Sequence, residues 1–297
     1  MSQDSVDFET LLRSSLDALK KQVVSENGDW TVKGFIDVYK RIYTISLDTK
    51  VLSKVLELLM YPVLAKLAAD HKYTIKPARQ QNQYPDITCI SQNGKKYAID
   101  IKSTYRKRPD KEKRERVNGM TLGTYAGYFR DRTSDSISTY PYDDYSQHLV
   151  LGVVYSQVKG IDERTIYSVD TLVDIPSVAK NFDFFVQEKY KIASDAVGAG
   201  NTKNMGSTKF LERMLNGSGI FAELGIDVFD DYWTHYRNKE TARADGLVKQ
   251  PYKNLIEYRE HIKRGKAILD VSETAIVSEE VELEEEGESV DVEGDEE

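Results

Sequence analysis

The sequence predicts a mixed α/β fold, in which strand-like and helix-like segments alternate along the chain. Residues 7–24 and 51–71 have the apolar spacing of helices, and residues 229–265 form a third, aromatic-rich helical region. Runs typical of strands lie between them, over residues 73–76, 86–90, 96–105, 149–158 and 183–194. We therefore expect a mixed sheet flanked by helices rather than an all-helical bundle.

Local signals justify the first of these elements in order. The opening helix places five apolar residues on one face: Phe8, Leu11, Leu12, Leu16 and Leu19. Leu47-Asp48-Thr49 is placed to cap the second helix. Gln92-Asn93-Gly94 separates two strand-like runs and is typical of a hairpin turn, so we expect residues 86–90 and 96–105 to pair.

Acidic charge is concentrated at the C-terminus. Of 49 acidic residues, thirteen lie in residues 271–297, which contain no Lys or Arg, so the rest of the chain sets 36 acidic against 41 basic residues. We predict one mildly basic domain over residues 1–270, followed by a disordered acidic tail over 271–297. The tail has two interpretations: a solubilising segment, or a DNA mimic that competes for a basic surface.

Several protein classes are disfavoured by composition. The sequence has no apolar run near the roughly 20 residues that cross a bilayer, and its first residues are polar and acidic. Cys89 is the single cysteine, and the four histidines have no zinc-ligand spacing. We expect a cytoplasmic protein with no membrane association.

The segment with the clearest chemistry is Tyr84-Pro85-Asp86, followed by Asp100-Ile101-Lys102. Side chains alternate along a strand, so Asp100 and Lys102 share a face. Pairing through the predicted turn would bring Asp86 to Asp100, where two carboxylates can bind Mg²⁺. Lys102 would then neutralise the attacked phosphate or favour a deprotonated water. An alternative for so short a motif is a surface salt bridge.

Four further segments are candidates for metal or DNA contact. Glu57 is a third candidate ligand, although its helical neighbours also fit a solvated face. The Gly- and Asn-rich loop 198–207 carries groups that read bases, and its alternative is an ordinary flexible connection. The cluster Gln80-Gln81-Asn82 can bond bases or phosphates, and equally fits a solvated turn. The basic stretch 106–116 fits either a phosphate clamp or a solvated loop.

Together these segments resemble the EcoRV-type type II restriction endonucleases of the PD-(D/E)xK superfamily. The resemblance covers most of residues 45–265 in matching order. The segments that carry it are SLDTKVLSKVLELLMYPVLAKLA, QQNQYPDITC, AIDIKSTY, TLGTYAGYFR, GAGNTKNMGS, GIFAE, DYWTHYR and NLIEYREHIKRG. It implies a restriction-endonuclease-like mixed sheet flanked by helices, in a U-shaped homodimer around double-stranded DNA.

The resemblance also assigns roles to residues. The family's metal-binding and catalytic acids fall on Asp86, Asp100 and Glu57, and its catalytic lysine falls on Lys102. Its DNA-contacting positions fall on Lys50, Gln80, Gln81, Gly198, Gly200, Asn201, Thr202 and Asn204. The implied activity is Mg²⁺-dependent cleavage of the palindrome GATATC with blunt ends, alongside a protective DNA methyltransferase.

This chain departs from the family pattern at three positions near DNA. Ala199 stands where a Ser is expected, Lys203 where a Thr is expected, and Ser134 where a Lys is expected. These differences affect phosphate contacts and site context more than the chemistry. Two other functions stay open from the sequence: another nuclease of the same superfamily that acts in repair or on junctions, and a DNA-binding protein that has lost cleavage.

Overall fold

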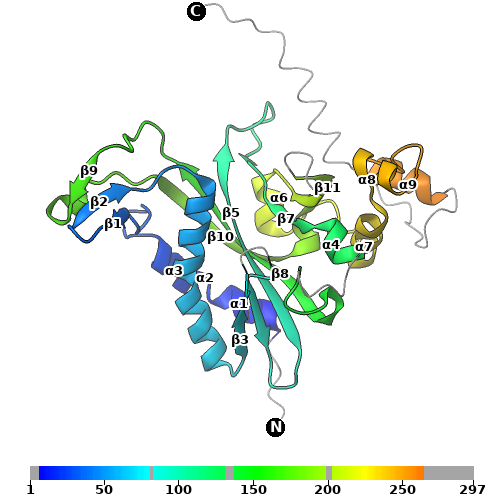
Figure 1. The fold of residues 1–297 in the computed structure, drawn as a ribbon, viewed down its shortest axis with the longest axis horizontal. Coiled ribbons are helices and arrows are strands. Elements are labelled where there is room, and N and C mark those ends of the chain that lie inside the picture. The colour runs from blue at the N-terminus through cyan, green and yellow to red at the C-terminus, as the bar shows by residue number, and fades with distance from the viewer. Residues whose placement is uncertain (1–6, 81–82, 131–136, 199–202, 264–297) are drawn as a thin grey trace, which may run out of the picture. The chain divides into compact units, whose positions relative to one another are not determined.

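The computed structural model of the protein describes residues 7–80, 83–130, 137–198 and 203–263 (Figure 1). The chain forms two compact units, each built from three separate stretches of the sequence. The first comprises Met1–Pro77, Asp86–Arg106 and Gln147–Val186, and the second comprises Ala78–Pro85, Lys107–Ser146 and Gln187–Glu297. The predicted partition into a domain over 1–270 and a tail stays a prediction, because residues 271–297 lie outside the described part.

The first unit contains the central sheet and the N-terminal helices. Its helical elements are α1 (Phe8–Ser14), α2 (Leu16–Val23), α3 (Thr49–Asp70) and the 3-10 segment η2 (Val169–Asp174). Its strands are β1 (Gly34–Ile36), β2 (Arg41–Thr44), β3 (Thr74–Pro77), β4 (Ile87–Ile90), β9 (Ile166–Ser168) and the larger parts of β5 (Lys96–Lys107), β8 (Tyr145–Gln157) and β10 (Ala179–Glu188).

The central sheet places β5 in its middle, in the order β10-β8-β5-β4-β3. Strands β3, β4 and β5 pair antiparallel. Apolar side chains of α1, α2 and α3 pack with one face of these strands in a single core, which includes Ile87, Ile99 and Ile101. A mixed α/β architecture with a helix-flanked sheet is therefore confirmed.

Two predicted elements are interrupted in the structure. The helix predicted over 7–24 is two helices, because the backbone breaks at Ser15, whose hydroxyl donates to the carbonyl of Leu12 at 2.7 Å. The single strand predicted over 183–194 was wrong: β10 ends at Glu188, and a four-residue helix, α5 (Lys189–Ile192), separates it from β11 (Ala193–Val197). The second helix was predicted correctly, and Asp48 caps it by accepting from the Lys50 N–H at 2.7 Å.

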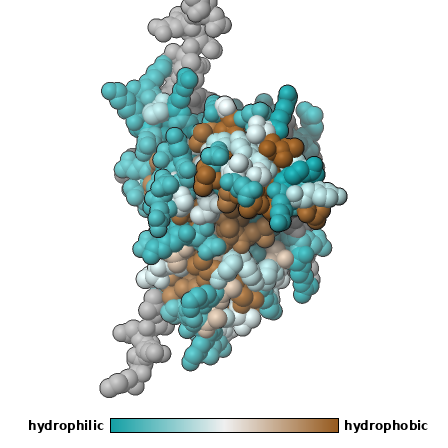
Figure 2. Space-filling model, turned by 90° about the vertical axis from the view of Figure 1, so that its left-hand side faces the viewer, coloured by the Kyte–Doolittle hydropathy of each residue, from teal (hydrophilic) through white to brown (hydrophobic). Residues whose placement is uncertain are grey.

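A small sheet, β1-β2-β9, presents apolar side chains to solvent in the first unit. Ile36 is 61 % exposed. Brown, apolar side chains gather on the face that Figure 2 shows. The exposed apolar residues of this sheet and the adjoining η2 are Phe35, Ile36, Tyr43, Ile166, Val169, Leu172 and Val173. We call this set the apolar face.

The second unit is built around aromatic side chains. Its strands are β6 (Arg116–Val117), β7 (Thr121–Thr124), β11 and β12 (Asn204–Ser207), and its sheet has the order β11-β12-β7. Its helical elements are α4 (Tyr125–Arg130), η1 (Tyr142–Asp144), α5, α6 (Leu211–Asn216), α7 (Ile226–His235), α8 (Lys239–Ala244) and α9 (Leu255–Lys263). The Tyr232 ring contacts Trp233 and Tyr252, with centroids 5.1 and 5.0 Å away. Its hydroxyl donates to the Asp195 carbonyl of β11 at 2.7 Å, which joins α7 to this sheet.

Within the described residues, no helix combines the length and apolar character needed to cross a bilayer.

Candidate active site

The β4–β5 hairpin positions the two aspartates. Thr88 lies opposite Ala98 and Ile87 opposite Ile99, so Asp86, which directly precedes β4, comes close to Asp100, which directly follows Ile99 on β5. The turn closes at Gly94, whose φ of +83° suits glycine and whose N–H donates to the Ser91 carbonyl at 3.0 Å. The predicted pairing of these strands is confirmed, and it brings the two acids to the same end of the hairpin.

Three charged side chains meet at this end. The Lys102 ammonium lies 2.8 Å from Asp100 Oδ1 and 3.8 Å from Asp86 Oδ2. Asp86 Oδ2 also accepts the Ile101 N–H at 2.7 Å, a bond that fixes the carboxylate against β5. Asp100 is 4 % exposed, whereas the Asp86 and Lys102 side chains are about a quarter exposed. The cluster is therefore anchored in the sheet and open to solvent on one side.

Burial and like charge make this site electrostatically unusual. Burial and then the neighbouring Asp100 carboxylate raise the pKa of Asp86 to about 7. Burial opposes the charge on Lys102, but the attraction of Asp100 and Asp86 outweighs it and raises the pKa of this ammonium. At neutral pH Lys102 is therefore positively charged, and the Asp86 carboxyl ionises far less readily than that of an ordinary aspartate.

The donor set fits a hard divalent cation. Two carboxylates that repel one another are a favourable pair of oxygen ligands for Mg²⁺, because a cation removes the repulsion. The Lys102 ammonium already lies between them as a positive charge. Among the described residues, no cluster of three or more His, Cys, Asp or Glu side chains has the arrangement of a metal site. The protein thus supplies two carboxylates here, and water and phosphate oxygens would complete a shell.

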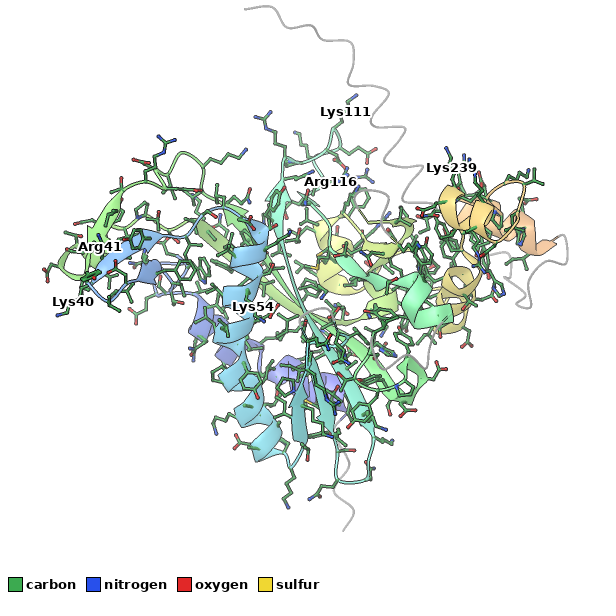
Figure 3. The ribbon with its side chains drawn as sticks, in the orientation of Figure 1. Lys40, Arg41, Lys54, Lys111, Arg116 and Lys239 are labelled. Atoms are coloured by element: carbon green, nitrogen blue, oxygen red, sulfur yellow. The ribbon has the colours of Figure 1, made fainter. Side chains whose placement is uncertain are left out.

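Glu57 lies on α3 and does not join the two aspartates in such a cluster. Ser53, one turn earlier, bonds hydroxyl to hydroxyl with Ser103 of β5 at 2.7 Å, which holds this helix face against β5. Glu57 pairs with Lys54 at 2.6 Å. Figure 3 labels Lys54 on α3. Its charge contributes to raising the pKa values of Asp86 and Lys102. A role for Glu57 in catalysis stays a prediction.

The sequence did not reveal the Ser53–Ser103 contact. Neither serine belongs to a motif, and the two are 50 residues apart. Only Ser53 could have been singled out from the sequence, because it lies four residues before Glu57 on the same face of the predicted helix.

The predicted DNA-contacting residues are partly described. Lys50 is exposed in the first turn of α3, in the first unit, and Gln80 is exposed in the second. Gly198 and Asn204 form the stem of the predicted recognition loop, with the Gly198 N–H donating to the Asn204 carbonyl at 2.8 Å. Four predicted positions lie outside the described residues: Gln81, Gly200, Asn201 and Thr202.

The basic stretch 106–116 is partly neutralised by the protein itself. Arg106 donates to the Asn181 carbonyl and the Asp183 carboxylate. Arg114 pairs with Asp110 at 2.6 Å. These two arginines bind groups of the protein itself. This weakens the prediction that the whole stretch is a phosphate clamp.

A mixed sheet whose central hairpin carries Asp, Asp and Lys together is the arrangement expected of a PD-(D/E)xK nuclease. Residues 26–263 match the model of the family described as restriction endonuclease EcoRV. The chain is also similar to the type II restriction enzyme EcoRV of Escherichia coli, with 37 % identity over 245 residues, which cover 81 % of this chain and 94 % of that protein. The chain belongs to the EcoRV restriction endonuclease family, and its enzyme class is type II site-specific deoxyribonuclease.

Proposed function

We propose that this protein is a homodimeric, Mg²⁺-dependent restriction endonuclease that cuts double-stranded DNA at GATATC and leaves blunt ends. The observation that carries the proposal is the joining of Asp86, Asp100 and Lys102 at one end of the β4–β5 hairpin. Membership of the EcoRV family supports the reaction class. A cytoplasmic location and a protective methyltransferase belong to the same proposal.

Each residue of the site has a distinct task in phosphodiester hydrolysis. Asp86 and Asp100 would hold Mg²⁺, with Glu57 as a further acid. The bound cation would polarise the scissile phosphate and lower the pKa of an attacking water. Lys102 stays protonated because of its raised pKa, so its ammonium neutralises charge on the phosphoryl oxygens rather than accepting a proton.

Sequence recognition is assigned to two loops of the second unit. Gly198, Gly200, Asn201, Thr202 and Asn204 would read base edges in the major groove, and Gln80 and Gln81 the minor groove. Lys50 would contact the backbone near the site. The retained loop residues support GATATC as the target, while Ala199 and Lys203 are the positions where its context would differ.

The apolar face supports a homodimer. Contiguous exposed apolar side chains on a β-sheet mark an interaction surface, and a second copy presents the same surface. Two-fold symmetry gives one active site per strand and requires a palindromic target. A U-shaped arrangement around DNA is part of this proposal.

A plasmid digest tests the proposal. Unmethylated plasmid with one GATATC site is incubated with protein and Mg²⁺, and in parallel with EDTA. We expect one blunt linear product that needs Mg²⁺, and no product from Asp100→Asn, whereas Asp70→Asn, at an exposed surface ion pair, keeps full activity.

The other outcomes separate the alternatives. A linear product with ends elsewhere keeps the nuclease and rejects the target. Cleavage that depends on DNA structure but not on sequence indicates a repair or junction nuclease. Specific retention of DNA without cleavage under any divalent cation indicates a binding protein and overturns the enzymatic proposal.

A further inference from the structure

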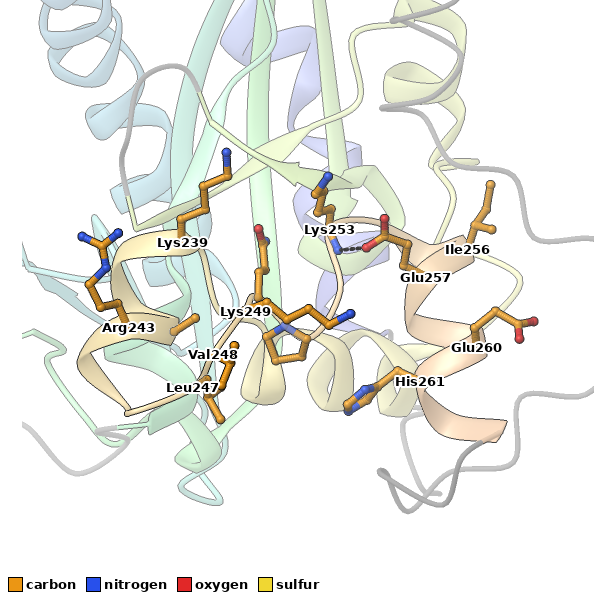
Figure 4. Close-up of a pocket in the computed structure, with 13 residues that line it drawn as sticks. Lys239, Arg243, Leu247, Val248, Lys249, Lys253, Ile256, Glu257, Glu260 and His261 are labelled. Carbon is orange, nitrogen blue, oxygen red and sulfur yellow. Dashed lines mark hydrogen bonds between the residues drawn. The ribbon is translucent and has the colours of Figure 1, made fainter.

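A pocket of about 870 Å³ lies in the second unit, between α8, the segment that follows it and α9 (Figure 4). Lys239 and Arg243 come from α8, and Ile256 and His261 from α9. The wall between these helices is the segment from Leu247 to Lys253. None of these residues belongs to the proposed catalytic cluster or to the recognition loops.

The pocket is lined by four exposed cations: Lys239, Arg243, Lys249 and Lys253. Their side chains form no ion pair with the residues that the structure describes. The acids beside them are fewer, and Glu257 accepts the backbone N–H of Lys253 at 2.9 Å. The pocket therefore has an excess of positive charge for an anionic ligand.

Apolar side chains share the same lining. Leu247 and Ile256 are each 44 % exposed, and Val248 is fully exposed. A simple phosphate would leave these side chains in water. The lining instead fits a polyanion that carries apolar side chains between its charges.

The C-terminal tail of this chain has that chemistry. Residues 271–297 contain thirteen acids and no Lys or Arg. Apolar residues are interspersed with the acids at Val277, Val281, Leu283, Val290 and Val292. The tail lies beyond residues 26–263, the part of the chain that matches the family model.

The tail also starts close to the pocket along the chain. It follows α9, one wall of the pocket, after the seven residues 264–270. Seven extended residues span up to about 25 Å, whereas a nine-residue helix is about 14 Å long. The connection is therefore long enough to turn back along α9, and a short tether gives an effective concentration in the millimolar range.

We infer that the acidic tail, residues 271–297, docks into the pocket between α8 and α9 of its own chain. Its carboxylates pair with Lys239, Arg243, Lys249 and Lys253, and its valines and leucine cover Leu247, Val248 and Ile256. A docked tail withholds these four cations from any other polyanion. Because the pairs are exposed, docking weakens as salt increases.

Disulfide trapping in the full chain tests this inference. Val248→Cys and Leu283→Cys place one thiol at the pocket and one in the tail, and the native Cys89 is buried. The variant is oxidised at about 50 mM salt, where charge pairs are weakly screened, and at about 1 M salt, where they are strongly screened. The intrachain disulfide is followed by non-reducing gel and mass spectrometry. We expect formation at least tenfold faster at low salt.

A matched pair of charge reversals separates docking from mere proximity. Lys239→Glu with Arg243→Glu, added to the trapping variant, should slow the disulfide at least tenfold at low salt. Lys20→Glu with Lys21→Glu changes the net charge equally on exposed positions of α2 and should leave the rate unchanged. Equal rates in both reversals, or disulfides only between chains, would overturn the inference.

Discussion

Asp86→Asn should stabilise the metal-free protein while it abolishes cleavage. The pKa of Asp86 is raised from 3.8 to about 7 in the fold, so ionising this carboxyl opposes folding. At about 1.4 kcal/mol for each pKa unit, the unfavourable contribution at pH 8 is roughly 4 kcal/mol. Because the side chain is 24 % exposed, we halve this for solvent screening, to roughly 2 kcal/mol. Asn keeps an oxygen acceptor for the Ile101 N–H and carries no charge.

The stability difference between Asp86→Asn and the wild type changes with pH in a defined window. Between pH 3.8 and about 7 the folded protein holds a proton that the unfolded chain has released. The stabilisation from protonated Asp86 is therefore complete below the unfolded pKa and is lost as pH rises through about 7. The advantage of Asp86→Asn should be largest at pH 8 and shrink toward pH 5.

Thermal unfolding in EDTA measures this difference. For a protein of this size, roughly 2 kcal/mol corresponds to a rise in Tm of about 4 to 8 °C at pH 8. Asp70→Asn, at an exposed pair with Lys66, serves as the control and should change the free energy of unfolding by less than about 0.5 kcal/mol. Added Mg²⁺ should stabilise the wild type and leave Asp86→Asn unchanged. An Asp86→Asn variant no more stable than wild type at pH 8 in EDTA would refute the reasoning.

Three other perturbations follow from the structure. The single-turnover cleavage rate should rise with pH through about 7 as Asp86 loses its proton, and the midpoint should be lower at higher Mg²⁺ concentration. A rate profile without a step between pH 5.5 and 8.5 would argue against Asp86 as a ligand. Ser53→Ala should lower the free energy of unfolding by about 1 kcal/mol and reduce the cleavage rate, and Ser53→Thr should restore both. An unchanged cleavage rate in Ser53→Ala would show that the position of α3 does not affect cleavage. Ile36→Glu should convert dimer to monomer in sedimentation experiments, whereas Ile226→Glu, at an exposed residue of α7, should not; an unchanged dimer would move the interface away from the apolar face.

The β4–β5 hairpin was predictable because its determinants are local. Alternation in residues 96–105 and the Asn93-Gly94 turn fix which side chains share a face and which residues pair. The break at Ser15 and the insertion of α5 do not interrupt the apolar pattern. The break coincides with the bond from the Ser15 hydroxyl to Leu12, which apolar spacing does not reveal. The α5 carbonyls of Lys191 and Ile192 accept bonds from the distant Gly219 and Thr208.

Contacts between distant residues set the limit of the sequence interpretation. Arg106 was grouped with its basic neighbours, but its partner Asp183 is 77 residues away. The recognition residues Gly200, Asn201 and Thr202 rest on the family resemblance, since they lie outside the described residues. The plasmid digest with the GATATC site is therefore the test of their assignment.

The placement of Asp86 close to Asp100 at one end of the hairpin is itself an argument for function. Two like charges held this close in a partly buried site oppose folding. The hairpin cannot relieve the repulsion by shifting register, because a one-residue slip would turn Ile87 and Ile99 out of the core. Lys102 offsets the repulsion only in part, since the pKa of Asp86 stays raised with the ammonium beside it. The core thus holds two carboxylates close together, which above pH 7, where Asp86 is ionised, a further cation would make favourable. A purely structural salt bridge would need neither the second acid nor this register.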